Sequence, residues 1–227
     1  MFNIPNLLTL FNLLSGCLAV VFLFQHNIPA VLTCIAISLM ADFLDGFAAR
    51  LLKSYSDMGK ELDSLADMVS FGFIPGFIMF YLLQAGDFTV ITPFGVGGFI
   101  VTLFAALRLA KFNVDTRQSD TFLGLPTPSA TLFIAGLLLI SMNAPNAMIF
   151  QQPILLGLGI AISFLMISDL PMFSLKFKGF SWKGNEIRYI FIIFAVAMIA
   201  LLREYSLSLI IAAYTIYSLG RQLIKKR

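Results

Sequence analysis

The chain has 227 residues, of which 59% are hydrophobic and 12% are charged, with a formal net charge of +3 at pH 7. An average soluble domain is about 45–50% apolar and about 25% charged, so this composition excludes an ordinary soluble domain, and it also excludes a disordered chain. Apolar runs of about 20 residues instead predict an all-α fold, a polytopic integral membrane helical bundle.

Eight apolar segments follow one another along the chain, and each predicts a transmembrane helix. The third contains Pro75, which predicts a kink, and Pro126 and Pro128 mark a loop before the fifth. Only Arg203 and Glu204 separate the last two, which predicts a tight hairpin. The segments cover residues 5–24, 29–51, 60–84, 92–113, 127–143, 153–169, 186–203 and 205–222.

The basic residues gather on one side of this predicted bundle. If each segment crosses the membrane once, successive gaps between segments lie on alternating sides. Of the 15 Lys and Arg residues, 14 then lie on one side, and only Arg203 lies on the other. Because cytoplasmic segments carry an excess of Lys and Arg, we expect both termini in the cytosol, in an inner or plasma membrane. The basic C-terminal residues are expected to contact anionic membrane lipids, and no nucleic acid is expected as a partner.

Acidic residues are concentrated at the turn between the second and third segments. Six of the 12 Asp and Glu residues fall between positions 42 and 67. Asp42 and Asp45 are three residues apart, and Asp63 and Asp67 are four apart, so each pair lies on one face of its helix. Since a cytosolic turn joins the two segments, we expect the two pairs to converge at the cytosolic end.

Four carboxylates that converge in an apolar bundle need cations or water to offset their charge. A single Asp at the centre of a membrane helix costs about 2.5–3.5 kcal/mol. Oxygen ligands without His or Cys favour magnesium, manganese or calcium, and two carboxylate-bridged divalent ions suit phosphoryl chemistry. We therefore expect two ions, Mg²⁺ or Mn²⁺. The alternative is a solvated polar hairpin, which fits Asp57 and Glu61.

The acidic stretch resembles the signature of the CDP-alcohol phosphatidyltransferase family, D-x2-D-G-x2-A-R-x8-G-x3-D-x3-D. Residues 3–12, 107–113 and 122–130 resemble the membrane-integral branch of that family that uses serine as acceptor. The resemblance covers roughly residues 3–135. The last two segments are similar to the family only in being apolar helices. All eight fixed positions of the signature match, namely Asp42, Asp45, Gly46, Ala49, Arg50, Gly59, Asp63 and Asp67.

The resemblance implies a reaction in which CDP-diacylglycerol and L-serine give phosphatidylserine and CMP. It implies that Asp42, Asp45 and Asp63 bind two divalent ions that clamp the diphosphate. Asp67 is similar to the family's proposed general base, which takes the proton of the acceptor hydroxyl, and it is also a candidate ligand of the second ion. Asp63 and Asp67 are thus the expected catalytic residues. The residues expected to line the nucleotide are Gly46, Ala49, Arg50 and Gly59.

Five residues outside the signature are further candidates for substrate binding. Asn6, Thr9 and Asn12 lie about one turn apart at the cytosolic start of the first segment, and that face could contact the nucleotide or the diphosphate. Helix capping and interhelical hydrogen bonding are the alternative. The serine carboxylate needs a cation, for which we expect Arg108 or Lys111. The alternative is that both are only topology charges.

The resemblance also implies an architecture and an assembly. It implies a single domain over residues 1–227, with a catalytic core of about 3–170 that contains the family's six helices. An additional helix pair over about 186–222 brings the count to about eight. Members of the family are commonly homodimers, so a homodimer is expected.

Two other functions remain open at this stage. The same fold with another acceptor, glycerol 3-phosphate or inositol phosphate, would need an extra basic cluster, and the charges near the site do not exclude it. A cation channel or transporter would need acidic residues along a pore. The opposite half of the bundle carries almost none, with Asp87 and Glu204 at its edge.

Overall fold

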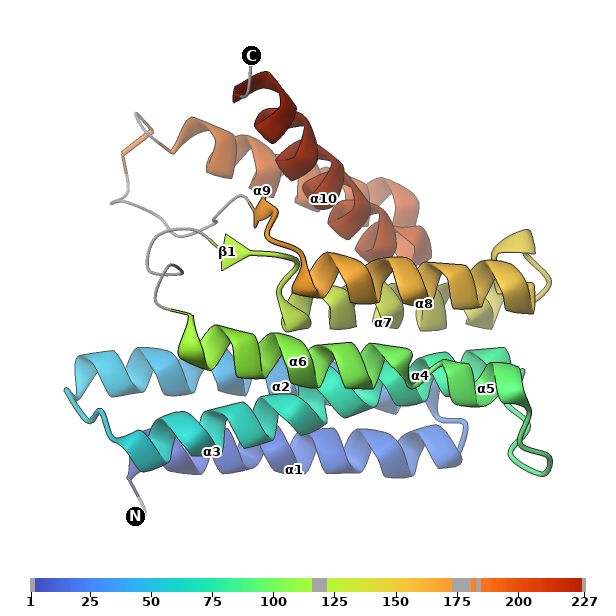
Figure 1. The fold of residues 1–227 in the computed structure, drawn as a ribbon, viewed down its shortest axis with the longest axis horizontal. Helices are drawn as coiled ribbons and strands as arrows, with labels where there is room; N and C mark the ends of the chain where they lie inside the picture. Colours follow the sequence, from blue (N-terminus) through green and yellow to red (C-terminus); the bar gives the residue numbers. More distant parts are fainter. Residues whose placement is uncertain (1–2, 116–121, 173–180, 183–184, 226–227) are drawn as a thin grey trace.

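Helices occupy each of the eight apolar segments in the computed structural model, which describes residues 3–115, 122–172, 181–182 and 185–225 (Figure 1). The helices are α1 (Ile4–Phe24), α2 (Ile28–Leu51), α3 (Asp57–Asp67), α4 (Ile74–Leu83), α5 (Pro93–Gly97), α6 (Ile100–Val114), α7 (Thr127–Asn143), α8 (Gln152–Ile167), α9 (Glu186–Leu202) and α10 (Ser206–Lys225). The short elements are the π-helix η1 (Met68–Phe73), the 3₁₀ turns η3 (Met148–Phe150) and η4 (Arg203–Tyr205), and the strands β1 (Phe122–Leu123) and β2 (Pro171–Met172).

Five helical stretches in the described residues are long and apolar enough to cross a membrane. They cover Ile4–Phe24, Ile28–Leu51, Asp57–Leu83, Pro93–Val114 and Glu186–Gly220, and the last contains the α9–α10 hairpin. The apolar helices α7 and α8 are shorter, at 17 and 16 residues. The fold is therefore that of a helical membrane protein, and the total of eight crossings stays a prediction.

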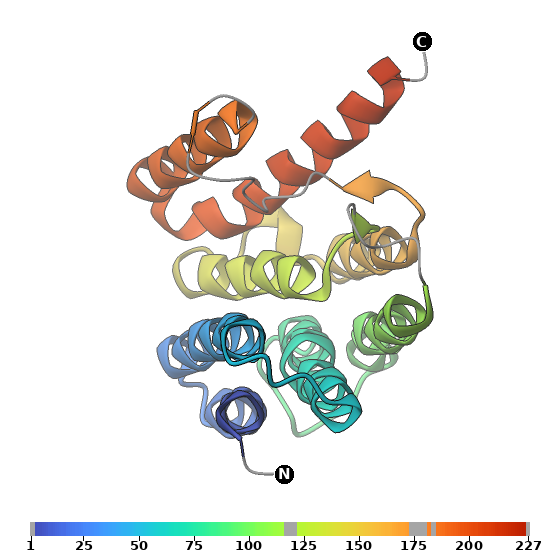
Figure 2. The ribbon, with the colours of Figure 1, turned by 90° about the vertical axis from the view of Figure 1, so that its left-hand side faces the viewer.

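The helices form stacked layers in which α7 and α8 lie between the first helices and the C-terminal pair (Figure 2). On one side, α7 packs against α4, and α8 packs against α6. On the other side, α10 crosses α7, where the Ser208 hydroxyl donates to the Phe133 carbonyl at 2.9 Å. The N-terminus, the α2–α3 turn and the end of α6 lie at one end of the bundle, opposite the α1–α2 turn (Figure 1). The described part of this end carries Arg50 and Lys53 of the α2–α3 hairpin and Lys111 near the end of α6.

Side-chain caps set the starting points of α1 and of α3, the second helix of the acidic hairpin. Asn3 caps α1 by accepting a hydrogen bond from the Asn6 amide at 3.0 Å, and Pro5 lies in the first turn. Ser56 caps α3 by accepting from the Gly59 amide at 3.0 Å. Asn and Ser satisfy amide groups that have no partner in the first turn of a helix. The caps therefore fix which residues of α1 and α3 face one another.

A π-helical turn, η1, follows directly after Asp67 at the place where the sequence predicts a kink. Pro75 has no amide hydrogen, so the Phe71 carbonyl, four residues earlier, loses its α-helical donor. The Thr131 hydroxyl of α7 lies 3.3 Å from that carbonyl, and its shorter hydrogen bond goes to the Thr127 carbonyl at 2.9 Å. The Thr102 hydroxyl of α6 donates to the Gly72 carbonyl at 3.1 Å. Neighbouring helices thus hold the altered backbone in place, as buried backbone in a membrane requires.

The all-α prediction omits one small element, the antiparallel pair of β1 and β2. Leu123 pairs with Pro171, and the next residue, Gly124, has a positive φ of 75° and donates its amide to the Leu170 carbonyl at 2.8 Å. The Leu125 amide then donates to the Leu165 carbonyl at 2.9 Å. The two short extended segments therefore fasten the start of α7 to the end of α8.

Gly124→Ala should lower the melting temperature of the detergent-solubilised protein. A Cβ at this position would lie 2.4 Å from the Met166 carbonyl oxygen and 2.7 Å from that of Ser168, and the positive φ adds strain. Such strained positions cost about 1–3 kcal/mol each. Gly157→Ala is the matched control, since a Cβ on Gly157 in α8 would have no neighbouring atom within 4 Å, and it should keep or raise stability. Equal melting temperatures of the two variants would contradict this account of the loop.

Candidate active site

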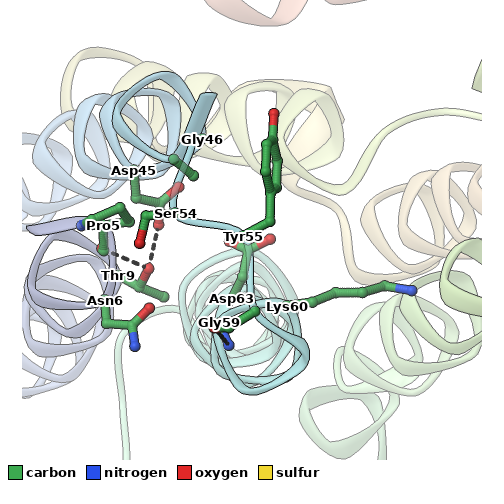
Figure 3. Close-up of a pocket in the computed structure, with 12 residues that line it drawn as sticks. Pro5, Asn6, Thr9, Asp45, Gly46, Ser54, Tyr55, Gly59, Lys60 and Asp63 are labelled. Atoms are coloured by element: carbon green, nitrogen blue, oxygen red, sulfur yellow. Dashed lines mark hydrogen bonds between the residues drawn. The ribbon is translucent and has the colours of Figure 1, made fainter. Parts of the chain in front are cut away.

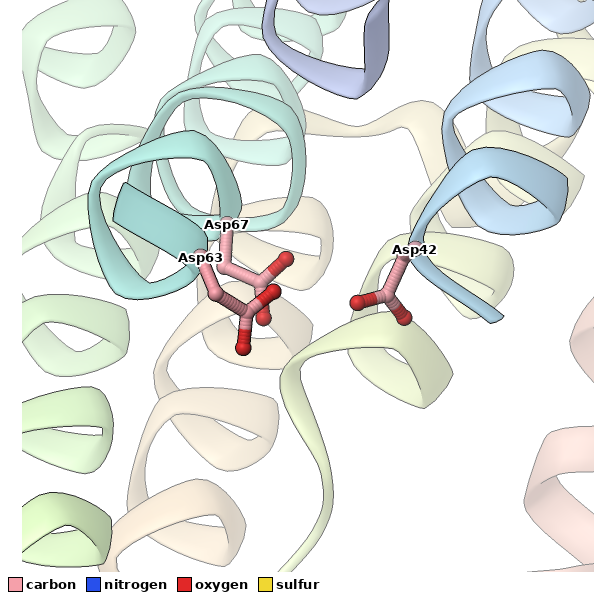
Figure 4. A group of neighbouring side chains, drawn as sticks. All are labelled: Asp42, Asp63 and Asp67. Atoms are coloured by element: carbon pink, nitrogen blue, oxygen red, sulfur yellow. The ribbon is translucent and has the colours of Figure 1, made fainter. Parts of the chain in front are cut away.

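Three of the four predicted carboxylates converge where α2 and α3 face each other. Asp42 extends from α2, and Asp63 and Asp67 extend from successive turns of α3, so that the three side chains point toward one another (Figure 4). One oxygen atom from each lies within 4.8 Å of one from each of the others. The helical spacing that the sequence shows therefore brings residues from two elements to one point.

Asp45, the fourth carboxylate, is directed toward α1. Its Oδ2 accepts a hydrogen bond from the Thr9 hydroxyl at 2.6 Å, and the residue is 6% exposed. The Thr9 hydroxyl also lies 3.1 Å from the Pro5 carbonyl (Figure 3). Asp45 is not part of the three-carboxylate group in the described residues. The structure therefore gives Asp45 a partner from the protein, while Asp42, Asp63 and Asp67 form the close group.

The close group fits a divalent cation by the chemistry of its donors. Two unit charges 4 Å apart repel by about 4 kcal/mol at an effective dielectric constant of 20. Among the described residues, no Lys or Arg forms an ion pair with these carboxylates. Asp63 Oδ1 is buried and has no hydrogen-bond partner there. Hard oxygen ligands without His or Cys are those that Mg²⁺ and Mn²⁺ prefer.

A cleft of about 190 Å³ opens beside the carboxylates, between α1, α2 and α3 (Figure 3). Five of the predicted substrate-binding residues line it together with two of the Asp residues, which lie at its wall. The predicted lining residues are Asn6, Thr9, Gly46, Ala49 and Gly59, and the two carboxylates are Asp45 and Asp63. The cleft is open to the same end of the molecule as the α2–α3 turn, where the signature residues meet.

Of the two glycines of the signature, Gly59 allows close approach at the cleft wall, whereas Gly46 has only ordinary contacts around it. A Cβ on Gly59 would lie 3.0 Å from the Ser56 hydroxyl and 3.1 Å from Asn6 Oδ1, tighter than ordinary contact. A Cβ on Gly46 would lie 3.6 Å from Nη1 of Arg50. Arg50 therefore folds over Gly46 from the next helical turn, exposed and beside the cleft rather than lining it. Its guanidinium is free to reach an anion at the cleft mouth.

The sequence prediction missed part of the cleft wall. Ser54, Tyr55 and Lys60 line it as well. Ser54 and Tyr55 fall in the eight-residue spacer whose identity the signature leaves open, and Lys60 follows Gly59 directly. The structure shows what holds this turn at the cleft, since Asn3 at the start of α1 donates from its side-chain amide to the Ser54 hydroxyl at 2.9 Å. That bond fixes the turn over the start of α1.

Arg108 and Lys111, the predicted serine-binding cations, lie on α6 and do not line the cleft. The Arg108 guanidinium is buried, donates to the Leu123 carbonyl and lies 5.9 Å from the centre of the Phe112 ring. The Lys111 ammonium pairs with Asp169 at 2.8 Å and donates to the Ile167 carbonyl at 3.0 Å. Both cations therefore connect α6 to the segments around β1 and β2, and their role toward serine stays a prediction.

Comparison with known proteins gives consistent matches. The model of the CDP-alcohol phosphatidyltransferase family matches residues 2–167. A CDP-diacylglycerol–serine O-phosphatidyltransferase of Bacillus subtilis is 35% identical over 172 residues, which cover 74% of this chain and 88% of the relative. One of the same name from Helicobacter pylori is 29% identical over 223 residues, covering 96% and 90%. An archaetidylserine synthase of Methanothermobacter thermautotrophicus is 31% identical over 169 residues, covering 74% and 68%.

Asp42→Asn should raise thermal stability in the absence of metal and reduce the stabilisation that metal provides. In EDTA it relieves repulsion in the close group, so the melting temperature should rise, by about 2–4 °C for each 1 kcal/mol relieved. In saturating Mn²⁺ the melting temperature of the variant should rise less than that of the wild type. For the wild type, ligand at 100 times its Kd adds about 2.7 kcal/mol to the free energy of unfolding. Asp57→Asn, at the exposed start of α3, is the control and should follow the wild type in both conditions. An Asp42→Asn protein that gains as much as the wild type from Mn²⁺ would contradict the metal-site assignment.

Proposed function

This chain belongs to the CDP-alcohol phosphatidyltransferase family, and from that premise we propose that it transfers the phosphatidyl group of CDP-diacylglycerol to the hydroxyl of L-serine, giving phosphatidylserine and CMP. It is an enzyme of phospholipid synthesis in a membrane. The observation that carries the choice of serine is that relatives covering 74% and 96% of the chain share the name CDP-diacylglycerol–serine O-phosphatidyltransferase. The carboxylates and the cleft supply the chemistry that this activity needs.

The close group of Asp42, Asp63 and Asp67 is the place where divalent cations fit, with Asp45 beside it at the cleft. We propose two ions, Mg²⁺ or Mn²⁺. When bound, they would offset the charge of the diphosphate and stabilise CMP as the leaving group. Two observations support this assignment: Asp63 Oδ1 has no hydrogen-bond partner among the described residues, and the donor set is all oxygen.

The cleft residues hold the nucleotide end of the lipid substrate. Asn6 and Thr9 supply polar groups from α1, and Gly46, Ala49 and Gly59 leave room for a ligand close to the backbone of α2 and α3. Arg50, which folds over Gly46, supplies a guanidinium that can contact a phosphate through two parallel hydrogen bonds. The acyl chains extend from this end of the bundle into the membrane.

We propose Asp67 as the general base. Its side chain belongs to the close group, and its Oδ1 accepts a hydrogen bond from the Asn12 amide at 3.4 Å. In the proposed step, an oxygen lone pair of the serine hydroxyl attacks the phosphorus that carries diacylglycerol, and the hydroxyl proton passes to Asp67. The bond from that phosphorus to the bridging oxygen breaks, and CMP leaves with the electron pair. A hydroxyl is a weak nucleophile at pH 7, so the adjacent base lowers the barrier.

The remaining features of the proposal concern the acceptor, the orientation and the assembly. Arg108 and Lys111 are the candidate cations for the serine carboxylate, and Lys111 would have to exchange its Asp169 partner to serve. We propose that the end with the cleft and the basic segments faces the cytosol, in agreement with the excess of Lys and Arg there. A homodimer and a single domain over the whole chain are further parts of the proposal.

CMP release by the purified protein tests the acceptor. With CDP-diacylglycerol and Mn²⁺ or Mg²⁺ present, L-serine should support CMP release, and glycerol 3-phosphate and inositol phosphate should not. EDTA should stop the reaction with serine, because the close group would lose its cations. Release of CMP with glycerol 3-phosphate and not with serine would overturn the proposed acceptor while leaving the family chemistry intact.

A further inference from the structure

Asn12 is a polar residue of α1 that lies outside the signature and is completely buried, with 0% of its surface exposed. It follows Asn6 and Thr9 at three-residue spacing on the same buried face. Thr9 donates to Asp45 of α2, and Asn12 donates to Asp67 of α3. We propose that Asn12 is a positioning residue for Asp67, whose side-chain amide holds one carboxylate oxygen and leaves the other free for the acceptor hydroxyl or a cation. This inference rests on the proposed function, in which Asp67 is the base.

The backbone of Asn12 is fixed independently of its side chain. Its carbonyl accepts hydrogen bonds from the Ser38 hydroxyl of α2 at 3.2 Å and from the Ser70 hydroxyl of η1 at 3.1 Å. One turn later, Gly16 lies so close to η1 that a Cβ would lie 2.5 Å from the Ser70 hydroxyl oxygen. Three elements therefore meet at this point of α1, and the side-chain amide of Asn12 projects toward Asp67 from a backbone whose position is fixed.

The side-chain amide has one orientation that is compatible with this neighbour. Its Nδ2 lies 3.4 Å from Asp67 Oδ1, and it is the sole hydrogen-bond donor to the Asp67 side chain among the described residues. The reverse orientation would turn the amide oxygen toward a carboxylate, with acceptor against acceptor. In the present orientation, Asn12 Oδ1 is buried and has no partner in the described part of the chain. A structural polar contact between helices would pair both ends of a buried amide, so this amide is oriented by Asp67.

The position of Asp67 in the chain makes such support necessary. Asp67 is the last residue of α3 and directly precedes the π-helical turn, where the helical register changes. The turn itself is held by α6 and α7 through the carbonyls of Gly72 and Phe71. Those bonds fix the backbone and leave the carboxylate rotamer undetermined. The Asn12 amide is the group that fixes the carboxylate.

A double-mutant cycle on Mn²⁺ binding tests this inference without serine turnover. The Kd for Mn²⁺ is measured by the EPR signal of the free ion for the wild type, Asn12→Leu, Asp67→Asn and the double variant. Loss of a residue that orients a ligand typically weakens metal binding about 10–100-fold, so Asn12→Leu should bind at least about tenfold more weakly than the wild type. In the Asp67→Asn background, Asn12→Leu should change the Kd for Mn²⁺ by less than about twofold, because the carboxylate through which Asn12 acts is no longer present.

Ser208→Ala is the matched control for helix packing. It removes a buried interhelical hydrogen bond between α10 and the Phe133 carbonyl of α7, away from the carboxylates, so it should keep the Mn²⁺ affinity while lowering thermal stability. Wild-type Mn²⁺ affinity in Asn12→Leu, or an equal loss in both backgrounds, would overturn the inference.

Asn12→Asp provides a second test that does not depend on Asn12→Leu folding. It keeps the size of the side chain and replaces the donor by an oxygen. It should lower kcat for CMP release at least about tenfold with little change in the KM for CDP-diacylglycerol. An unchanged kcat would overturn the inference. Failure of the wild type to release CMP with serine would instead overturn the proposed function, and the Mn²⁺ cycle would still decide the role of Asn12.

Discussion

The structure depends on one constraint, which is that carboxylates must be kept together inside an apolar helical bundle. Each of Asp42, Asp63 and Asp67 repels the other two, and no basic side chain of the described residues neutralises them. Isolated, such groups cost several kcal/mol in a membrane. They are held there because three helices fix their positions and because cations fit among their oxygens. Bound divalent cations would relieve the repulsion at this point, and they would also supply the positive charge that an anionic diphosphate needs.

The first helix is the element that organises the site, although it carries none of the signature. Its buried face presents Asn6 to the cleft, Thr9 to Asp45 and Asn12 to Asp67. The hairpin of α2 and α3 supplies the charges, and α1 supplies the donors that orient them. The π-helical turn η1 then connects Asp67 to α4, and hydroxyls of α6 and α7 approach its Gly72 and Phe71 carbonyls. Site and scaffold are thus built from the same hydrogen bonds.

Sequence reasoning located the helices and the convergence of Asp42 with Asp63 and Asp67, because helical periodicity and hairpin topology are local properties. It did not predict that Asp45 turns away toward Thr9, since that depends on the rotation of α1 against α2. The β1–β2 pair was also missed, because it joins residues about 50 positions apart through backbone groups that carry no side-chain pattern. Arg108 and Lys111 were identified from charge alone, and charge does not reveal that Leu123 and Asp169 are their partners.

The most direct test of the central claim is the effect of Asp67→Asn on turnover and on substrate binding, measured in the same preparation. If the carboxylates converge to perform the transfer, CMP release with serine should be abolished while CDP-diacylglycerol binding remains near that of the wild type. Glu61→Gln, on the exposed side of the same helix, should retain both CMP release and CDP-diacylglycerol binding. Loss of both turnover and binding, or of neither, in Asp67→Asn would contradict the assignment of Asp67 as the base.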